Sequence, residues 1–150
     1  YYFPISGGEF MDKEEKKIYR GPRPCEDELF DLKNKGVRAI VNLQREDTSS
    51  KEFIESLGMK FFHIPVIDHT APTVEQIEEF ISIAENEENL PLYVHCLAGL
   101  ERTGTMVACY RIYTGWDCED AIAYNYYETR WPLMDCQKEV VRQYARRINL

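Results

Sequence analysis

The sequence predicts an α/β fold: a single three-layer domain in which a mostly parallel central sheet carries helices on both faces. Short β-rich runs alternate along the chain with amphipathic segments of helical length, which is the pattern of parallel strands joined by helices. A chain of 150 residues, 44% of them hydrophobic, is large enough to bury one core but short for two. No self-similar period of about 20–50 residues is present, which excludes repeat architectures.

Glycines and helix-capping residues divide the first part of the chain into alternating elements. Gly36 and Gly58 suit the ends of two helices, and Ser49 with Glu52 predicts a capping box at the start of the second helix. The expected order is strand 18–20, helix 26–35, strand 37–43, helix 49–57 and strand 59–66. Residues 1–17 form an N-terminal extension whose degree of order the sequence does not fix.

The second part of the chain continues this alternation and then becomes helical. A loop over residues 67–72 leads to a second predicted capping box, formed by Thr73 and Gln76, which opens a helix ending near residue 84. Residues 92–95 form the last predicted strand. Three helices follow: one over residues 103–114, a second opening near Asp117 and a third over residues 135–148. Residues 1–150 are therefore interpreted as one domain.

The composition excludes several classes of protein. A net charge of −8 and a pI near 4.9 repel polyanions, so no binding to nucleic acid is expected. No apolar run approaches the roughly 18 residues of a membrane span, and the first residues lack the features of a signal peptide. Tyr124, Tyr126 and Tyr127 are interpreted as helix-packing side chains rather than a stacking platform for bases.

The cysteine spacing argues against a metal site. The five cysteines are odd in number and match neither a zinc-binding pattern nor a CxxC redox pair, so no metal is expected. Reduced thiols predict a cytoplasmic location.

The residues that indicate chemistry lie in the turn between the strand at 92–95 and the following helix. Five residues separate Cys96 from Arg102, enough to wrap a loop of backbone N–H groups around one tetrahedral anion at a helix N-terminus. A strand–loop–helix turn is also where an α/β sheet offers ligands a crevice. The predicted phosphate-binding residues are Leu97, Ala98, Gly99, Leu100, Glu101 and Arg102.

Each residue type in this loop has a chemical reason. Helix-terminal amides and a neighbouring arginine favour the thiolate, so Cys96 is the expected nucleophile. The Arg102 guanidinium grips two phosphoryl oxygens in a planar, bidentate way that lysine cannot reproduce. Gly99 has no Cβ to obstruct the ligand or the turn. The Thr103 hydroxyl can donate to the sulfur and ease its departure.

The pattern His95-Cys96-x-x-Gly99-x-x-Arg102-Thr103 resembles the signature of the cysteine-dependent protein tyrosine phosphatase superfamily. Its continuation over residues 104–110 is similar to the small atypical dual-specificity phosphatases and other compact members, and the resemblance extends from about residue 19 to residue 144. It implies a metal-independent phosphomonoester hydrolase that forms a phosphocysteine intermediate, needs no cofactor, and acts on phosphotyrosine or mixed phosphoprotein substrates or on a small phosphomonoester.

The resemblance also implies a general acid on a loop upstream of the cysteine. Asp68, in the irregular segment after a predicted strand, fits this role. Asp47 is a weaker candidate for the acid, because a role at the start of the following helix explains it more simply. By the same resemblance, Gln137 helps to position water, and His95 is expected to shape the loop rather than to act as a base.

Alternative substrates and roles remain open from the sequence. Inositol phosphates or phosphoinositides are the second substrate class, although Glu101 departs from the family pattern and disfavours densely charged ligands. A phospho-binding pseudophosphatase and an arsenate reductase or sulfur-transfer enzyme rank lower.

Other polar residues could support the site. A basic wall around the pocket could be built by Arg20, Arg23, Arg45 and Arg130, and a basic rim by Arg130 and Lys138. Cys109, Cys118 or Cys136 could pair with Cys96 on oxidation, while His63 and His69 are interpreted as ordinary surface or loop residues.

Overall fold

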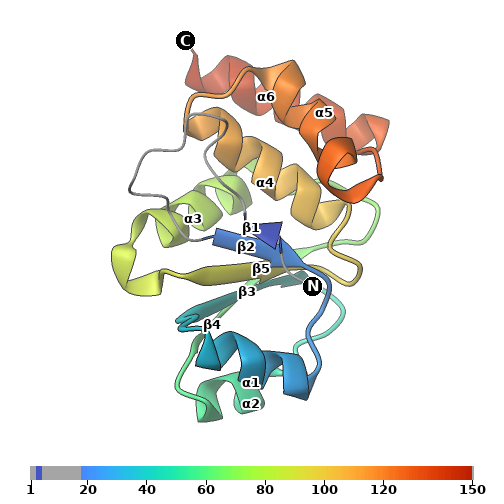
Figure 1. The fold of residues 1–150 in the computed structure, drawn as a ribbon. Coiled ribbons are helices and arrows are strands. Elements are labelled where there is room, and N and C mark those ends of the chain that lie inside the picture. The colour runs from blue at the N-terminus through green and yellow to red at the C-terminus, as the bar shows by residue number, and fades with distance from the viewer. Residues whose placement is uncertain (1–2, 5–17, 150) are drawn as a thin grey trace.

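A five-stranded sheet runs through the centre of the molecule in the computed structural model, which describes residues 3–4 and 18–149 (Figure 1). The strand order is β1-β2-β5-β3-β4, and every neighbouring pair is parallel except the antiparallel pair β1 and β2. The strands are β1 (Phe3–Pro4), β2 (Ile18–Gly21), β3 (Ala39–Gln44), β4 (Lys60–Val66) and β5 (Leu92–His95). Apart from β1, the extension over residues 1–17 lies outside the described residues.

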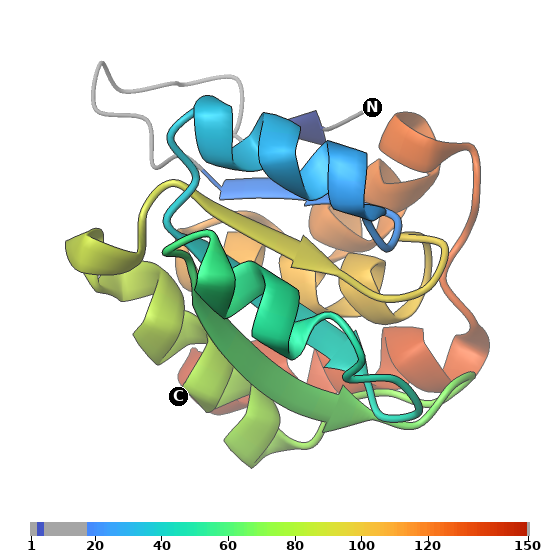
Figure 2. The same cartoon turned by 90° about the horizontal axis from the view of Figure 1, so that it is seen from below.

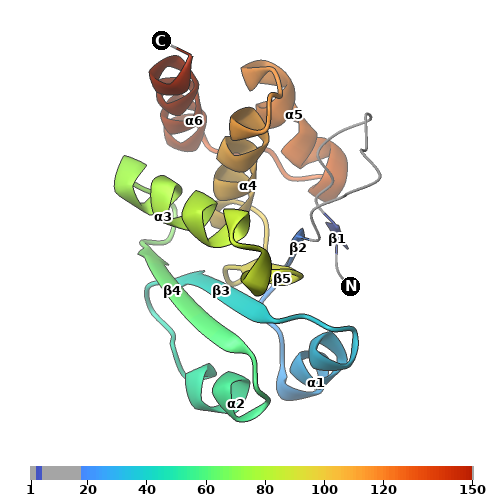
Figure 3. The same ribbon diagram turned by 90° about the vertical axis from the view of Figure 1, so that its left-hand side faces the viewer.

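Helices cover both faces of the sheet, as the alternating pattern predicts (Figure 3). One face carries α1 (Glu26–Asn34) and α2 (Lys51–Ser56). The other carries α3 (Val74–Glu85) and α4 (Arg102–Tyr113), with α5 (Cys118–Thr129) and α6 (Asp135–Ile148) packed against α4. A short 3-10 helix, η1 (Glu87–Asn89), follows α3. The α/β class and its three layers are thus confirmed.

The strands alternate between the two faces with a period of two residues. Ile40 of β3 and Tyr93 of β5 belong to the core beneath α1 and α2, whereas Val41 and Val94 belong to the core beneath α3 and α4. Both faces are therefore apolar, as expected for parallel strands that are covered on both sides. The helix α4 is buried from Arg102 to Ile112, so it lies inside its layer and fixes the loop that precedes it.

The parallel strands bring four loops to one edge of the sheet. The segments that follow β2, β3, β4 and β5 all leave from the carboxyl ends of the strands, and Figure 2 shows them gathered on the same side of the molecule. This edge is where doubly covered parallel sheets bind ligands. It contains the loop after Cys96 and the segment around Asp68.

The helix starts show one correct prediction and one error. Thr73 and Gln76 form the expected capping box, with the Gln76 N–H donating to Thr73 Oγ1 and the Thr73 N–H donating to Gln76 Oε1. The capping box predicted for Ser49 is wrong, because α2 begins one residue later and the Ser49 hydroxyl donates to Asp47 instead. Among the described residues no helix is both long and apolar enough to cross a bilayer.

Candidate active site

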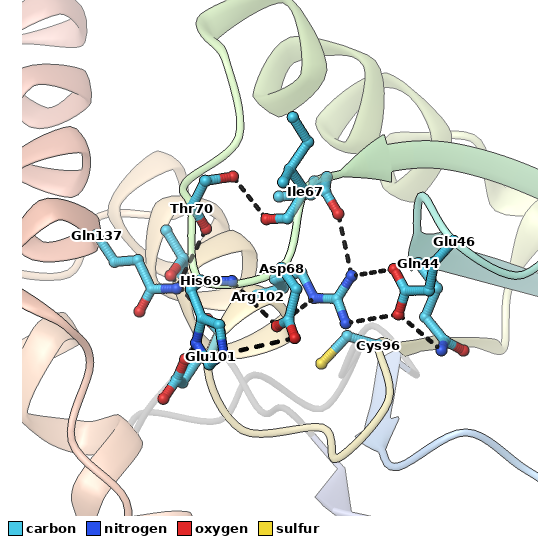
Figure 4. Close-up of polar contacts among 12 residues, drawn as sticks. Gln44, Glu46, Ile67, Asp68, His69, Thr70, Cys96, Glu101, Arg102 and Gln137 are labelled. Carbon is cyan, nitrogen blue, oxygen red and sulfur yellow. Dashed lines mark hydrogen bonds and ion pairs between the residues drawn. The ribbon is translucent and has the colours of Figure 1, made fainter.

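The loop over residues 96–101 joins β5 to α4 and holds the cysteine that the sequence singled out (Figure 4). Cys96 is 3% exposed, and the backbone N–H of Gly99 donates to its Sγ at 3.3 Å. The helix α4 begins at Arg102, so its N-terminal dipole and unpaired N–H groups lie at the end of the loop. These N–H groups place partial positive charge around the sulfur.

The first carbonyls of this loop accept hydrogen bonds from groups outside it. His95 Nδ1 lies 3.0 Å from the Cys96 carbonyl oxygen, and the backbone N–H of Arg23 donates to the Leu97 carbonyl at 2.9 Å. Burial lowers the pKa of His95 to about 4, so the imidazole is neutral near pH 7. Because a carbonyl oxygen only accepts, the ring proton sits on Nδ1. His95 therefore donates to the backbone at the start of the loop.

Arg20 and Asn125 hold the next carbonyls of the loop from behind. Arg20 Nη2 donates to the Gly99 carbonyl at 2.8 Å and lies 3.4 Å from the Leu100 carbonyl, to which Asn125 Nδ2 donates at 3.1 Å. Arg20 is fully buried and pairs with Glu128 at 3.3 Å. Burial lowers its pKa to about 10, so it stays charged at neutral pH. The prediction that Arg20 belongs to a basic wall is wrong, because it lies beneath the loop.

This arrangement sets the direction of the loop amides. In a trans peptide the N–H points away from the C=O of the same unit, so carbonyls fixed on the outside leave the following N–H groups facing inward. No described residue accepts a hydrogen bond from these N–H groups. They belong to Leu97, Ala98, Leu100 and Glu101, four of the six predicted phosphate-binding residues.

Gly99 is required by the backbone that lies behind it. Its φ of +77° is in the left-handed region, and a Cβ there would overlap the backbone of Gly21 and come within 2.7 Å of the Pro22 nitrogen. The glycine thus lets the loop pack directly on the end of β2. The sequence predicts a glycine here to leave room for the ligand or the turn, and the structure adds the close contact with the end of β2.

Arg102 is held by partners that leave one edge of its guanidinium open. Nη1 and Nη2 donate to the two carboxylate oxygens of Glu46 at 2.8 and 3.0 Å, and Nη1 also donates to the Val66 carbonyl at 3.0 Å. A guanidinium has five N–H groups, so Nε–H and the second Nη2–H remain, and these two share one edge. That edge can bind two oxygens of a phosphoryl group.

The charges at this pair reinforce each other. The hydrogen bonds from Arg102 lower the pKa of Glu46 to about 2. Burial acts to lower the pKa of Arg102, but the bonds to Glu46 and the nearby negative charges of Cys96, Glu46 and Asp68 outweigh it, and the pKa is raised. Glu46 thus fixes a charged guanidinium in a single orientation.

Asp68 lies beside the open edge of Arg102. Its Oδ1 is 3.6 Å from Arg102 Nε, and Figure 4 shows Cys96, Arg102 and Asp68 gathered in one place. The Asp68 side chain is 55% exposed, so a ligand on the loop and solvent can both reach it. The structure therefore brings together the three residues to which the sequence assigned nucleophile, anion binding and proton transfer.

Other predicted residues have structural partners. Gln137 is buried, and its amide accepts from the Met134 N–H and donates to the Thr70 carbonyl at 3.2 Å, which ties α6 to the Asp68 loop. The Thr103 hydroxyl is buried and has no hydrogen-bond partner among the described residues.

Asp47 is engaged by side chains of the turn before α2. It accepts from the Ser49 N–H and hydroxyl, and Arg23 pairs with it across the turn before α2. The hydrogen bond from the Ser49 hydroxyl is the largest cause that lowers the pKa of Asp47, and a carboxylate held ionised does not serve as an acid. Of the predicted basic wall, Arg45 and Arg130 are exposed, and Arg23 is paired with this aspartate.

The cysteines are all free thiols. Burial raises the pKa of Cys109 well above its usual range, as expected for an inert thiol inside α4. Cys136 is exposed, and its Sγ lies 3.7 Å from the His69 carbonyl. Within residues 18–149 no three His, Cys, Asp or Glu side chains form a cluster suited to a metal ion.

Comparison with known protein families agrees with this geometry. Residues 5–143 match the family described as "DSP-PTPase phosphatase fused to NAD+ Kinase". The chain belongs to this family. It is thereby a member of the cysteine-dependent protein tyrosine phosphatase superfamily that the loop sequence resembles.

Three proteins illustrate what this phosphatase-family chain is similar to. It is 30% identical over 120 residues to the probable chloroplastic NAD kinase 2 of Oryza sativa subsp. japonica, covering 75% of the chain and 12% of that protein. It is 37% identical over 79 residues to the human dual specificity protein phosphatase CDC14A, covering 53% of the chain and 13% of that protein. The chain thus spans about an eighth of these relatives. The crystal structure of PTPMT1 in complex with PI(5)P shares the fold, with a TM-score of 0.80 and 21% identity over 99% of this chain and 96% of that one.

Four residues of this phosphatase site were not assigned their roles from the sequence. Glu46 had a usable signal, because it follows the carboxyl end of a buried strand, where attention went to Asp47 instead. The sequence places Arg20 in a basic wall and gives His69 only a loop position, whereas the His69 ring lies 3.6 Å from Asp68 Oδ2 and 3.5 Å from Glu101 Oε2. Asn125 gave no local signal, since its partner Leu100 lies 25 residues away.

Proposed function

We propose that this chain hydrolyses phosphomonoesters through a phosphocysteine intermediate. One observation carries the proposal: the buried Cys96 sulfur accepts the Gly99 N–H in a loop whose Arg102 presents its open edge beside Asp68. In the first step Sγ attacks phosphorus, the ester P–O bond breaks, and Asp68 gives its proton to the departing oxygen. Arg102 and the inward N–H groups bind the phosphoryl oxygens as charge moves onto the leaving group.

The second step regenerates the enzyme with water. Asp68, now a carboxylate, takes a proton from the water that attacks phosphorus, and the P–S bond breaks to release inorganic phosphate. We assign the Thr103 hydroxyl to the departing thiolate, because it is buried and none of the described residues is its hydrogen-bond partner. Gln137 supports the Asp68 loop through Thr70 and is near enough to that loop to orient the water.

Hydrolysis of p-nitrophenyl phosphate in the presence of EDTA tests this proposal. The unmodified protein should turn over the ester, and Cys96→Ser should abolish turnover while the protein still binds inorganic phosphate or vanadate. Cys109→Ser is the matched control and should retain activity, because that thiol is buried inside α4. Phosphate binding without turnover by the unmodified protein would instead identify a pseudophosphatase.

The surroundings of the loop favour phosphorylated proteins over densely charged ligands. Leu97, next to the nucleophile, is 56% exposed, and Trp131 is 49% exposed beside Glu101. These apolar surfaces suit the ring of a phosphotyrosine. Two of the arginines proposed for a basic wall are unavailable, since Arg20 is buried and Arg23 is paired.

The second substrate class is inositol phosphates or phosphoinositides. The fold shared with PTPMT1, whose crystal structure contains PI(5)P, keeps this class as the alternative. Rates on a phosphotyrosine peptide, a phosphothreonine peptide, an inositol polyphosphate and NADP+ separate the possibilities, the last because the family is described as fused to NAD+ kinase. We expect the phosphotyrosine peptide to have the highest kcat/KM. A higher value for the inositol polyphosphate would reverse the assignment.

A further inference from the structure

Glu101, the residue that departs from the family pattern, does not point its charge at the anion-binding loop. Its Oε1 accepts from the Trp131 indole N–H at 2.9 Å, and its Oε2 lies 3.5 Å from His69 Nδ1. The Glu101 side chain is 19% exposed, so the carboxylate lies between Trp131 and His69 in a partly buried position. The Glu101 carboxylate is thus directed toward Trp131 and His69 and away from the anion-binding side of the loop.

His69 connects this carboxylate to the proposed general acid. Its Nε2 lies 3.6 Å from Asp68 Oδ2, while its Nδ1 faces Glu101, so each ring nitrogen meets a different carboxylate (Figure 4). The remaining oxygen of Asp68 accepts the His69 N–H at 3.0 Å and faces Arg102 Nε. Asp68 is thus held from two sides, by Arg102 and by His69.

The backbone gives an independent indication that His69 is held in place. Its φ is +61°, a left-handed conformation that costs a non-glycine residue free energy and persists only where the surroundings enforce it. A turn between Ile67 and Thr70 and the bond from Gln137 to Thr70 fix the backbone on either side. Since the His69 side chain is 69% exposed, the two carboxylates are what orient its ring.

We propose that Glu101, acting through His69, is a positioning residue for the general acid Asp68. Without this link the half-exposed Asp68 side chain can rotate into solvent and lose its place beside Arg102. The proposal rests on the proposed function, because it requires Asp68 to be the acid. It assigns a task to the residue by which this loop differs from the family pattern.

Leaving-group dependence tests the proposal. Only esters with poor leaving groups need a donated proton, so Glu101→Gln and His69→Ala should lower kcat/KM on phenyl phosphate by about tenfold or more, as expected for a misplaced catalytic group. Their kcat/KM on p-nitrophenyl phosphate should fall far less, because that leaving group needs no proton, and thermal melts check that the variants are folded. Trp131→Phe, which removes one donor to Glu101, should give a smaller selective loss.

Double variants and a matched control complete the test. Adding Glu101→Gln to Asp68→Asn should cause no further loss on phenyl phosphate, because the acid is already absent. Glu119→Gln removes a surface carboxylate that pairs with Arg142 at 2.9 Å and should change neither rate. Equal slowing of both esters by Glu101→Gln, no slowing of either, or an additive loss in the double variant would overturn the positioning role.

The outcome separates this proposal from the proposed function. If Asp68→Asn is selective for poor leaving groups and Glu101→Gln is not, the positioning role fails while the mechanism stands. If Asp68→Asn itself lowers kcat/KM on both esters equally, Asp68 is not the acid, and both its acid role and the positioning role of Glu101 fall.

Discussion

Activity is expected to depend on the shape of the Arg102 side chain as well as on its charge. Arg102→Lys keeps the positive charge but cannot bind Glu46 at two points and present a second edge to a phosphoryl group. We expect kcat/KM to fall by at least about 100-fold, the loss typical of removing a transition-state donor. Steady-state kinetics on p-nitrophenyl phosphate measure this. Arg142→Lys, at an exposed pair, is the control, and near-normal activity of Arg102→Lys would contradict the assignment.

Asp68 should affect only reactions that need a proton. Asp68→Asn is expected to lower kcat/KM on phenyl phosphate by about 100-fold or more and to leave kcat/KM on p-nitrophenyl phosphate nearly unchanged, because kcat/KM reports the first step, in which only the poor leaving group needs a proton. A plot of log kcat/KM against the basicity of a series of phenols gives the result directly, as a steeper slope in the variant. Asp47→Asn should leave the slope unchanged. An unchanged slope in Asp68→Asn removes this residue from the acid role.

His95 should make stability depend on pH. Its folded-state pKa of about 4 lies below the ordinary value of about 6.5, so between these values the unfolded chain binds a proton that the native protein does not. Stability is therefore fully present above about pH 6.5 and falls by up to about 3 kcal/mol as the pH drops to about 4. Urea unfolding from pH 7 to pH 4 should show this loss, and His95→Asn should reduce it. An equally steep loss in His95→Asn would place its origin in other groups.

Residues that act in sequence-local patterns were predictable, and those that act across the fold were not. Cys96, Gly99 and Arg102 have fixed offsets within one turn, so their types and spacing were enough. Glu46 and His69 reach the site from other loops, and their partners follow from the side-by-side arrangement of β3, β4 and β5. A sequence alone contains no such distances.

At the element scale, the close packing of the loop on β2 predicts a specific effect of Gly99→Ala. The new Cβ would collide with the Gly21 backbone, and the left-handed φ adds strain. Gly115→Ala is a matched control, because Gly115 has a φ of +112° with no atom near the position of a Cβ. Both variants should lose about 1 kcal/mol or more of stability, but only Gly99→Ala should lose activity. Equal activities measured alongside thermal melts would refute the packing argument.

The order of the elements was predictable because local signals agree with the fold. Glycines close α1 and α4, and the box of Thr73 and Gln76 opens α3. The start of α2 was misplaced because Asp47 competes for the Ser49 hydroxyl, and Asp47 is itself fixed by Arg23 from the segment between β2 and α1. The strand order required the right-handed crossovers of the whole fold and could not be read from any one segment.

The whole molecule is acidic, yet it has a site suited to an anion, because buried arginines lie at and beneath the loop that forms this site. The chain has a net charge of −8, whereas the buried Arg102 and Arg20 place positive charge at and beneath one loop. Substrate attraction is therefore short-range and comes from this loop. The conformation of this loop depends on β2, β5 and α4, which pack around it at the edge of the sheet.

The proposed mechanism depends most on a covalent bond between Cys96 and phosphorus. The most direct measurement is mass spectrometry of the protein quenched in acid during turnover of p-nitrophenyl phosphate, followed by peptide mapping. We predict the added mass of one phosphoryl group on the peptide that contains Cys96, and none in Cys96→Ser. Turnover with no phosphorylated Cys96 peptide, or with the phosphoryl group on another residue, would contradict the mechanism.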